Sequence, residues 1–264
     1  MFHQLTMGLF AILAVVFFCI TFLTTKERIQ PDPSQKSSLG QDLKDLGKNI
    51  PWVILFLVTV LIFIGLSIRS ATMLYYFKYC AGNENLFSPF NIVGVMCSTA
   101  MVKRYGSKNL FIGALALSAA FAGMLILVPA TSVPLVFGLE ALRQFAWGLT
   151  APLLWAMMAD VADFSEWKTG RRATAMVFAA TVFGLKAGLS IGRAIASWIL
   201  SLFGYVPNAA QTADSILGIK LLASVFTAVA FFLGVACLFF YKIDAATGGR
   251  MAEELNERRK KYAS

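Results

Sequence analysis

Long apolar runs fill most of this chain and restrict the folds that are open to it. Seven such runs lie at about 5–24, 51–76, 86–102, 110–129, 134–159, 174–203 and 216–241. A helix needs about 20 apolar residues to cross a bilayer, and most of the runs reach that length. Hydrophobic residues make up 58% of the chain and charged residues 14%, a balance typical of membrane proteins. The sequence therefore predicts an all-α integral membrane protein with about seven transmembrane helices.

Two of the runs need individual comment. The first is predicted to be a transmembrane helix and not a signal peptide, because the residues before it, Met1-Phe-His3-Gln4, carry no lysine or arginine. The run at 86–102 is the weakest, since it is barely long enough and has Pro89 near its start. This run could form a complete transmembrane helix or a tilted segment that is only half inserted in the membrane.

Basic residues gather on one side of the predicted spans. They are Lys26, Arg28, Lys36, Lys44, Lys48, Lys103, Arg104, Lys108, Lys168, Arg171, Arg172, Lys242, Arg250, Arg258, Arg259, Lys260 and Lys261. The other side has little beyond Lys78. Short loops rich in lysine and arginine stay in the cytoplasm, so we expect a multi-pass inner-membrane protein with its amino terminus outside and its carboxyl terminus in the cytoplasm. The same pattern explains the net charge of +9, so the expected partner is the lipid bilayer and not nucleic acid.

A dense group of charges follows the fifth apolar run. The stretch Trp155-Ala-Met-Met-Ala-Asp160-Val-Ala-Asp163-Phe-Ser-Glu166-Trp167-Lys168-Thr-Gly170-Arg171-Arg172 marks a cytoplasmic loop between two spans, and the next run contains Phe183-Gly-Leu-Lys186-Ala-Gly188. In residue types and order, both stretches resemble the glycoside, pentoside and hexuronide cation symporters. These are the melibiose-permease type of the major facilitator superfamily.

The resemblance implies a domain organisation. Major facilitator proteins consist of two six-helix halves. Residues 1–25 would be the sixth helix of the family, 26–49 a cytoplasmic linker, 50–242 the six-helix carboxyl-terminal half and 243–264 a cytoplasmic tail. Within the linker a short amphipathic helix is expected around Leu39–Leu46, and the tail is expected to be a solvated helix.

The implied function is secondary active transport of a glycoside or other sugar, coupled to Na⁺ or H⁺ and needing no further cofactor. The resemblance covers about half of a family member, and the acidic residues that bind the coupling cation in the family lie in the other half. The chain would then be a truncated half-transporter whose missing amino-terminal half is a partner. Which sugar and which ion it uses stay open, as does its oligomeric state.

The sixth apolar run carries two separate stripes. Small residues recur every four positions, at Ala180, Gly184, Gly188, Gly192 and Ala196, which favours close packing against another helix. Polar residues recur on a different face, at Lys186, Ser190, Arg193 and Ser197. Lys186 lies about 18 Å of helical rise from Thr174, near the middle of the bilayer, where a charge facing lipid is costly. We interpret Lys186, Ser190 and Arg193 as part of a substrate and coupling cavity; a lysine with a purely structural partner is the alternative.

Two further spans carry polar residues that are candidates for the same cavity. In the fifth run, Glu140 and Arg143 share one helical face, which Trp147 continues. In the second run, Arg69 and the tyrosines Tyr75 and Tyr76 resemble the seventh helix of the family, which lines the sugar cavity. Aromatic faces and guanidinium groups suit sugar binding. A structural ion pair and interfacial tyrosines are the alternatives.

Charged residues of the cytoplasmic loops are predicted to form a gate. The basic members are Lys103, Arg104, Lys108, Lys168, Arg171 and Arg172, and the others are Asp160, Asp163, Glu166 and Trp167. The loop Lys103–Lys108 resembles a basic loop of the superfamily whose ion pairs open and close during transport. The three carboxylates at the end of the fifth run would supply the opposite charges, balanced by Lys168, Arg171 and Arg172.

Other classes of protein receive less support. The sequence has no zinc-protease, phosphate-loop or nucleophile-elbow motif, so an enzyme is not expected, although a membrane-embedded transferase remains an alternative. A heptahelical receptor or a retinal protein is a second alternative. A retinal protein, however, needs its Schiff-base lysine on the last helix, whereas Lys186 lies on the sixth of the seven predicted helices. No metal site is expected, because His3 is the only histidine and no cluster of ligands accompanies it.

Overall fold

The computed structural model of the chain describes residues 2–25, 39–81, 101–102, 104–129, 132–171 and 173–263. It divides into two compact units, Met1–Gln35 and Lys36–Ser264. The described residues of the first unit form the helix α1 (Phe2–Thr24), of which Thr6–Thr24 is apolar and long enough to cross a membrane.

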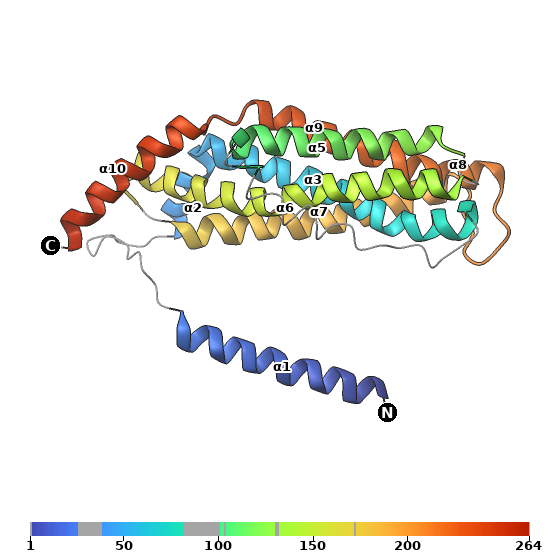
Figure 1. The fold of residues 1–264 in the computed structure, drawn as a ribbon, viewed down its shortest axis with the longest axis horizontal. Coiled ribbons are helices and arrows are strands. Elements are labelled where there is room, and N and C mark those ends of the chain that lie inside the picture. Colours follow the sequence, from blue (N-terminus) through green and yellow to red (C-terminus); the bar gives the residue numbers. More distant parts are fainter. Residues whose placement is uncertain are drawn as a thin grey trace. The chain divides into compact units, whose positions relative to one another are not determined.

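The second unit is a bundle of helices (Figure 1). Its elements are α2 (Leu39–Lys48), α3 (Ile50–Tyr75) with a π-helical end η1 (Tyr76–Ala81), α5 (Ser107–Met124) with a 3₁₀ end η2 (Leu125–Leu127), α6 (Val133–Thr169), α7 (Thr174–Leu202), α8 (Ala213–Leu221), the π-helical η3 (Leu222–Phe226), α9 (Thr227–Phe239) and α10 (Ala245–Ala263). The described residues form no strand, which confirms the predicted all-α class.

Six helices of the described residues are long and apolar enough to cross a membrane. They correspond to six of the seven apolar runs. The remaining run, 86–102, lies outside the described residues apart from 101–102, so its span stays a prediction. The short amphipathic helix expected near Leu39–Leu46 is confirmed as α2, and a helix in the tail is confirmed as α10.

One predicted boundary was wrong. The charged stretch after residue 159 was expected to be a loop, but α6 continues through it to Thr169. Buried side chains of Val161, Ala162 and Ser165 keep one face of this extension packed. The helix ends at Gly170, whose φ of 68° is a left-handed conformation that glycine adopts readily.

Local sequence explains where α3 begins. The side chain of Asn49 accepts a hydrogen bond from the backbone amide of Trp52 at 3.1 Å, and Pro51 lies in the first turn, where its missing amide hydrogen is not needed. The side-chain amide of Asn49 also donates to the carbonyl of Val161 at 3.2 Å. The start of α3 is thereby tied to the extended end of α6.

The helix α7 packs on α3 through its small residues. A Cβ atom added to Gly188 would lie 2.7 Å from the carbonyl oxygen of Val60, and one added to Gly192 would lie 2.6 Å from that of Ile64. The hydroxyl of Ser67 on α3 donates to the carbonyl of Leu189 at 2.6 Å. The predicted packing role of the small-residue stripe is confirmed, because the two backbones approach too closely for any larger side chain.

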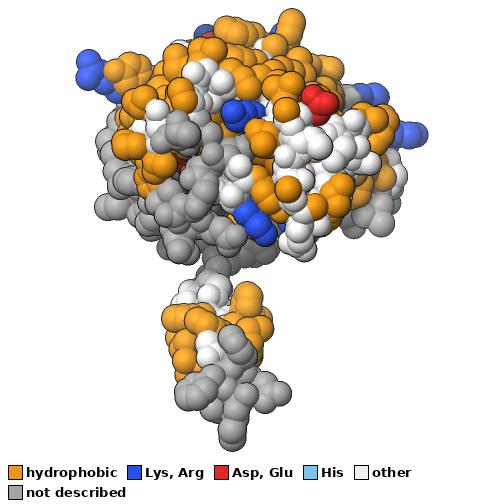
Figure 2. Space-filling model, turned by 90° about the vertical axis from the view of Figure 1, so that its right-hand side faces the viewer, with side chains coloured by type: hydrophobic (Ala, Val, Ile, Leu, Met, Phe, Trp, Pro, Cys, Tyr) orange, Lys and Arg blue, Asp and Glu red, His pale blue; other side chains and the backbone are white. Residues whose placement is uncertain are grey.

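The two ends of the bundle differ in how many charged residues they carry. One end, which we call the basic end, contains α2, the start of α3, the end of α6, residues 240–244 and α10. The opposite end contains the start of α8 and residues 203–212. Viewed onto this opposite end, the described surface is mostly apolar or uncharged, with few charged side chains (Figure 2).

The close α3–α7 contact predicts a specific sensitivity to side-chain size. Gly192→Ala should lower the stability of the bundle by roughly 1–3 kcal/mol, because the new methyl group meets the backbone of α3. Gly113→Ala on α5 is the matched control, since a Cβ there meets nothing within 4 Å. Thermal unfolding of both variants in detergent measures the difference. Equal unfolding temperatures would contradict the proposed contact.

Candidate functional site

The polar stripe of α7 lies on a face that its neighbours leave uncovered. Lys186, Ser190 and Arg193 are exposed in the bundle, whereas Gly184, Gly188 and Gly192 are buried. At 3.6 residues per turn, the middle of the polar stripe lies roughly 165° around the helix from the middle of the glycine stripe. The packing of α7 on α3 therefore turns the polar groups outward from this bundle.

Bulky apolar side chains flank the polar stripe. Phe183 and Trp198 are each 69% exposed. The uncovered side of α7 thus combines a lysine and an arginine with large apolar groups, a mixture that suits the boundary between an aqueous cavity and a second protein surface.

A buried cluster of charges joins three elements of the bundle. Glu140 on α6 forms ion pairs with Arg69 on α3 and with Arg143 one turn further along α6, the latter at 2.6 Å. Arg69 also donates to the carbonyl of Ala223 in η3. The arginine side chains are only 4% and 3% exposed, and that of Glu140 is 17% exposed. The cluster has two positive charges for one negative charge and connects α3, α6 and η3.

Two other predicted cavity residues lie inside the bundle. Trp147 packs in the apolar core, with its ring stacked on Phe231 at 5.5 Å between centroids. Tyr76 is also buried, beside Phe77. The structure therefore brings Arg69, Glu140 and Arg143 together, with Tyr76 close enough to Arg69 to interact with it electrostatically. Trp147 lies in the core, and the α7 stripe lies on an uncovered face.

Tyr75 belongs to a group of three tyrosines at the opposite end. Its ring lies 5.1 Å from that of Tyr205, in the segment between α7 and α8, and 6.5 Å from that of Tyr79. Burial raises the pKa of the Tyr205 phenol, and a hydrogen bond with Tyr79 raises it further. These partly exposed rings come from two segments that are distant in the sequence.

Contacts at the basic end fix α2 and the loop after α6. Arg171 forms ion pairs with Asp42 at 2.7 Å and with Asp45 at 3.3 Å, both on α2. Lys108, at the start of α5, donates to the backbone carbonyls of Phe239 and Tyr241 at the end of α9. Two of the predicted gate residues thus join helix ends to one another.

The end of α6 also binds α10. The indole nitrogen of Trp167 donates to Glu254 at 2.6 Å, and Arg258 donates to the carbonyl of Trp167 at 3.2 Å. Met251 and Leu255 of α10 are buried. The tail was expected to be a solvated helix, but this part of it packs on the bundle because Met251 and Leu255, four residues apart, form an apolar stripe.

The remaining predicted gate residues fall into three groups. The ammonium group of Lys168 lies 4.4 Å from the ring centroid of Trp167, and Arg104 lies over the ring of Tyr105. Asp160, Asp163 and Glu166 lie along the partly buried extension of α6. Burial raises the pKa of the Tyr241 phenol, and the nearby carboxylate of Asp160 adds to this shift. Lys103 and Arg172 lie outside the described residues.

Metal binding has no support in the described part of the chain. No three side chains of histidine, cysteine, aspartate or glutamate there are placed to hold a metal ion. The polar groups that the structure does offer, on α7 and in the Arg69 cluster, are suited to hydrogen bonding with hydroxyl groups and to attracting anions.

Comparison with known proteins decides the family. The profile described as MFS/sugar transport protein matches residues 3–245. The chain belongs to this family of sugar transporters. The resemblance to glycoside–cation symporters is thereby confirmed, and with it the prediction of a multi-pass membrane protein from a family of transporters and not of enzymes.

Several curated relatives support the assignment. The isoprimeverose transporter of Lactiplantibacillus pentosus is 34% identical over 89% of this chain and 50% of its own length. The inner membrane symporter YicJ of Escherichia coli (strain K12) is 31% identical over 84% of this chain and 50% of its own length. The putative glycoside/cation symporter YagG of the same organism is 29% identical over 93% and 55%. The chain spans about half the length of the relatives it matches.

Sequence reasoning missed several residues that the structure brings into these sites. Asp42 and Asp45 have a helical spacing that indicated a shared face, but nothing in the sequence named Arg171 as their partner. Glu254 in the tail, which binds Trp167, was read as part of a solvated helix. The contact between Arg69 and Ala223 involves a backbone carbonyl, for which the sequence offers no signal.

The Arg69 cluster predicts a large effect for the loss of its one carboxylate. Glu140→Gln should destabilise the protein by about 3–5 kcal/mol, because two buried guanidinium groups lose their counter-charge. Glu253→Gln, on the exposed face of α10, should change stability little. Denaturation of the two variants in the same detergent provides the comparison. A Glu140 variant as stable as the control would show that the ion pairs contribute nothing.

Proposed function

We propose that this chain forms the carboxyl-terminal half of the translocation pathway of a cation-coupled glycoside transporter. The substrate class follows from the family and from relatives named as an isoprimeverose transporter and a glycoside/cation symporter. A second helical bundle, on the same or on a separate polypeptide, completes the pathway.

The accessible polar stripe of α7 carries this proposal. Lys186 and Arg193 lie on a transmembrane helix, where charges facing lipid are strongly disfavoured. Because the packing of α7 on α3 turns these charges away from their own bundle, they need a water-filled cavity or an oppositely charged partner on a second bundle. A transport pathway between two bundles provides both.

The other polar groups take different roles in this proposal. Ser190 and Arg193 lie beside Lys186 and offer hydrogen bonds to sugar hydroxyls. The buried cluster of Arg69, Glu140 and Arg143 holds α3 and α6 together. Contacts at the basic end, centred on Arg171 and Trp167, form and break as the two bundles rock.

The orientation in the membrane is part of the proposal. With the basic end in the cytoplasm, Ala209, in the exposed segment before α8, faces the outside, and Glu253 on α10 faces the cytoplasm. In a chain without its native cysteines, Ala209→Cys should react with an impermeant maleimide added to intact cells. Glu253→Cys should react only after the cells are broken. The reverse pattern would overturn the orientation.

Transport itself can be tested in a fusion of this chain to the amino-terminal half of the isoprimeverose transporter. We expect the fusion to accumulate a labelled glycoside. Lys186→Ala should reduce accumulation to background, because the carboxylate that faces Lys186 across the cavity would lose its partner. Lys44→Ala, at an exposed position on α2, removes the same charge and should transport like the parent fusion.

Two outcomes would contradict the proposal. Full accumulation by the Lys186 variant would make this lysine a structural group. Robust cation-dependent uptake by this chain alone, without any amino-terminal half, would show that copies of it form a pathway by themselves. Immunoblots of membrane fractions check that every variant inserts to the same level.

A further inference from the structure

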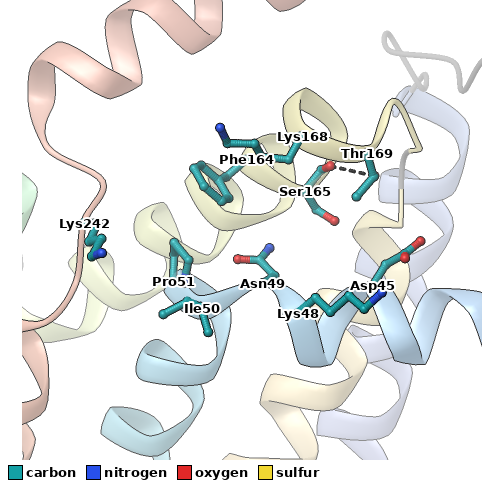
Figure 3. Close-up of a pocket in the computed structure, with 10 residues that line it drawn as sticks. All are labelled: Asp45, Lys48, Asn49, Ile50, Pro51, Phe164, Ser165, Lys168, Thr169 and Lys242. Atoms are coloured by element: carbon teal, nitrogen blue, oxygen red, sulfur yellow. Dashed lines mark hydrogen bonds between the residues drawn. The ribbon is translucent and has the colours of Figure 1, made fainter.

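A cavity of about 400 Å³ lies at the basic end, away from the polar stripe of α7. Its lining residues are Asp45, Lys48, Asn49, Ile50, Pro51, Phe164, Ser165, Lys168, Thr169 and Lys242. Figure 3 shows that they come from the end of α2, the start of α3, the end of α6 and the segment after α9. Four parts of the chain therefore meet around one space.

The walls of the cavity are mainly apolar and its lysines are exposed. Ile50, Pro51 and Phe164 contribute apolar surface, together with the alkyl stems of the lysines. Lys48, Lys168 and Lys242 are exposed and lie on different sides of the cavity (Figure 3). This distribution gives the cavity an apolar interior and a positively charged rim.

The carboxylate that lines this cavity is already paired. Asp45 also lines the cavity, but its side chain pairs with Arg171 at 3.3 Å. Within the described part of the chain, neither Lys48 nor Lys242 forms an ion pair with a carboxylate, and Lys168 lies over the ring of Trp167. Three ammonium groups thus surround an apolar space, and the carboxylate among its lining residues is paired with Arg171.

We propose that this cavity binds an anionic phospholipid, with part of an acyl chain against Ile50, Pro51 and Phe164 and the phosphate among Lys48, Lys168 and Lys242. Charge complementarity favours a phosphate over a neutral headgroup, since lysines near a membrane surface attract anionic headgroups. The apolar walls favour a lipid over a soluble phosphate, because a free phosphate would leave them exposed to water. The flexible lysine stems allow the ammonium groups to turn toward one phosphate.

Occupation of the cavity has a structural consequence. The lipid would touch the junction of α2 and α3, the end of α6 and Lys242 at the same time. It would therefore stabilise the basic end, where the ion pairs of Arg171 and the contacts of α10 also lie.

Native mass spectrometry of the full chain in detergent tests the proposal. Phosphatidylglycerol and phosphatidylcholine with identical acyl chains are titrated separately, and bound lipid is counted at each concentration. We expect tighter binding of phosphatidylglycerol to the unmodified chain. Removing two charges, by Lys48→Gln with Lys242→Gln, should weaken its binding by more than about tenfold.

A matched control separates the cavity from overall charge. Lys44→Gln with Arg250→Gln also removes two exposed positive charges near the basic end but touches no cavity residue, so its affinity should equal that of the unmodified chain. Equal weakening in both double variants, or equal binding of the two lipids, would overturn the proposal. Displacement of the lipid by glycerol phosphate or inorganic phosphate at similar concentrations would identify a soluble phosphate as the occupant and overturn it as well.

Discussion

The close contact between α7 and α3 decides which side chains of the bundle remain accessible. Gly188 and Gly192 bring α7 against the carbonyls of Val60 and Ile64, which leaves no freedom for α7 to rotate. Because the helix is fixed in this way, Lys186 and Arg193 are held on the uncovered side. A packing feature made of the smallest residues therefore determines where the charges lie.

Different kinds of ion pair stabilise the two ends of the bundle. At the opposite end, a buried carboxylate between two arginines joins α3, α6 and η3, and its strength derives from the absence of water. At the basic end, partly exposed pairs such as Arg171 with Asp42 are screened by water and salt. The first kind of contact is suited to permanent assembly, and the second can be broken and remade at little cost.

Much of this arrangement could be predicted from the sequence, and the limits have physical causes. Helical periodicity separated the glycine stripe from the stripe of Lys186, because both lie on one helix whose geometry is known in advance. The sequence could not predict which residues form ion pairs at the basic end. Arg171 and Asp42 are 129 residues apart and meet only in the folded bundle. The extension of α6 beyond residue 159 was not predicted because charged residues dominate this stretch. Its buried face consists of a few small apolar residues, such as Val161 and Ala162, which give only a weak helical pattern.

The π-helical segment η3 sets the phase of the last membrane helix. A π turn accommodates one residue more than an α turn, so η3 works as a one-residue insertion between α8 and α9. Without it, every side chain of α9 would be turned by about 100° relative to α8. Phe231, which stacks on Trp147, and Gly234, which fits against Ile62 and Leu115, would then leave the core. Residues of α8 and α9 must therefore be counted in two separate helical registers. A one-residue deletion within η3 would rotate the side chains along the whole of α9.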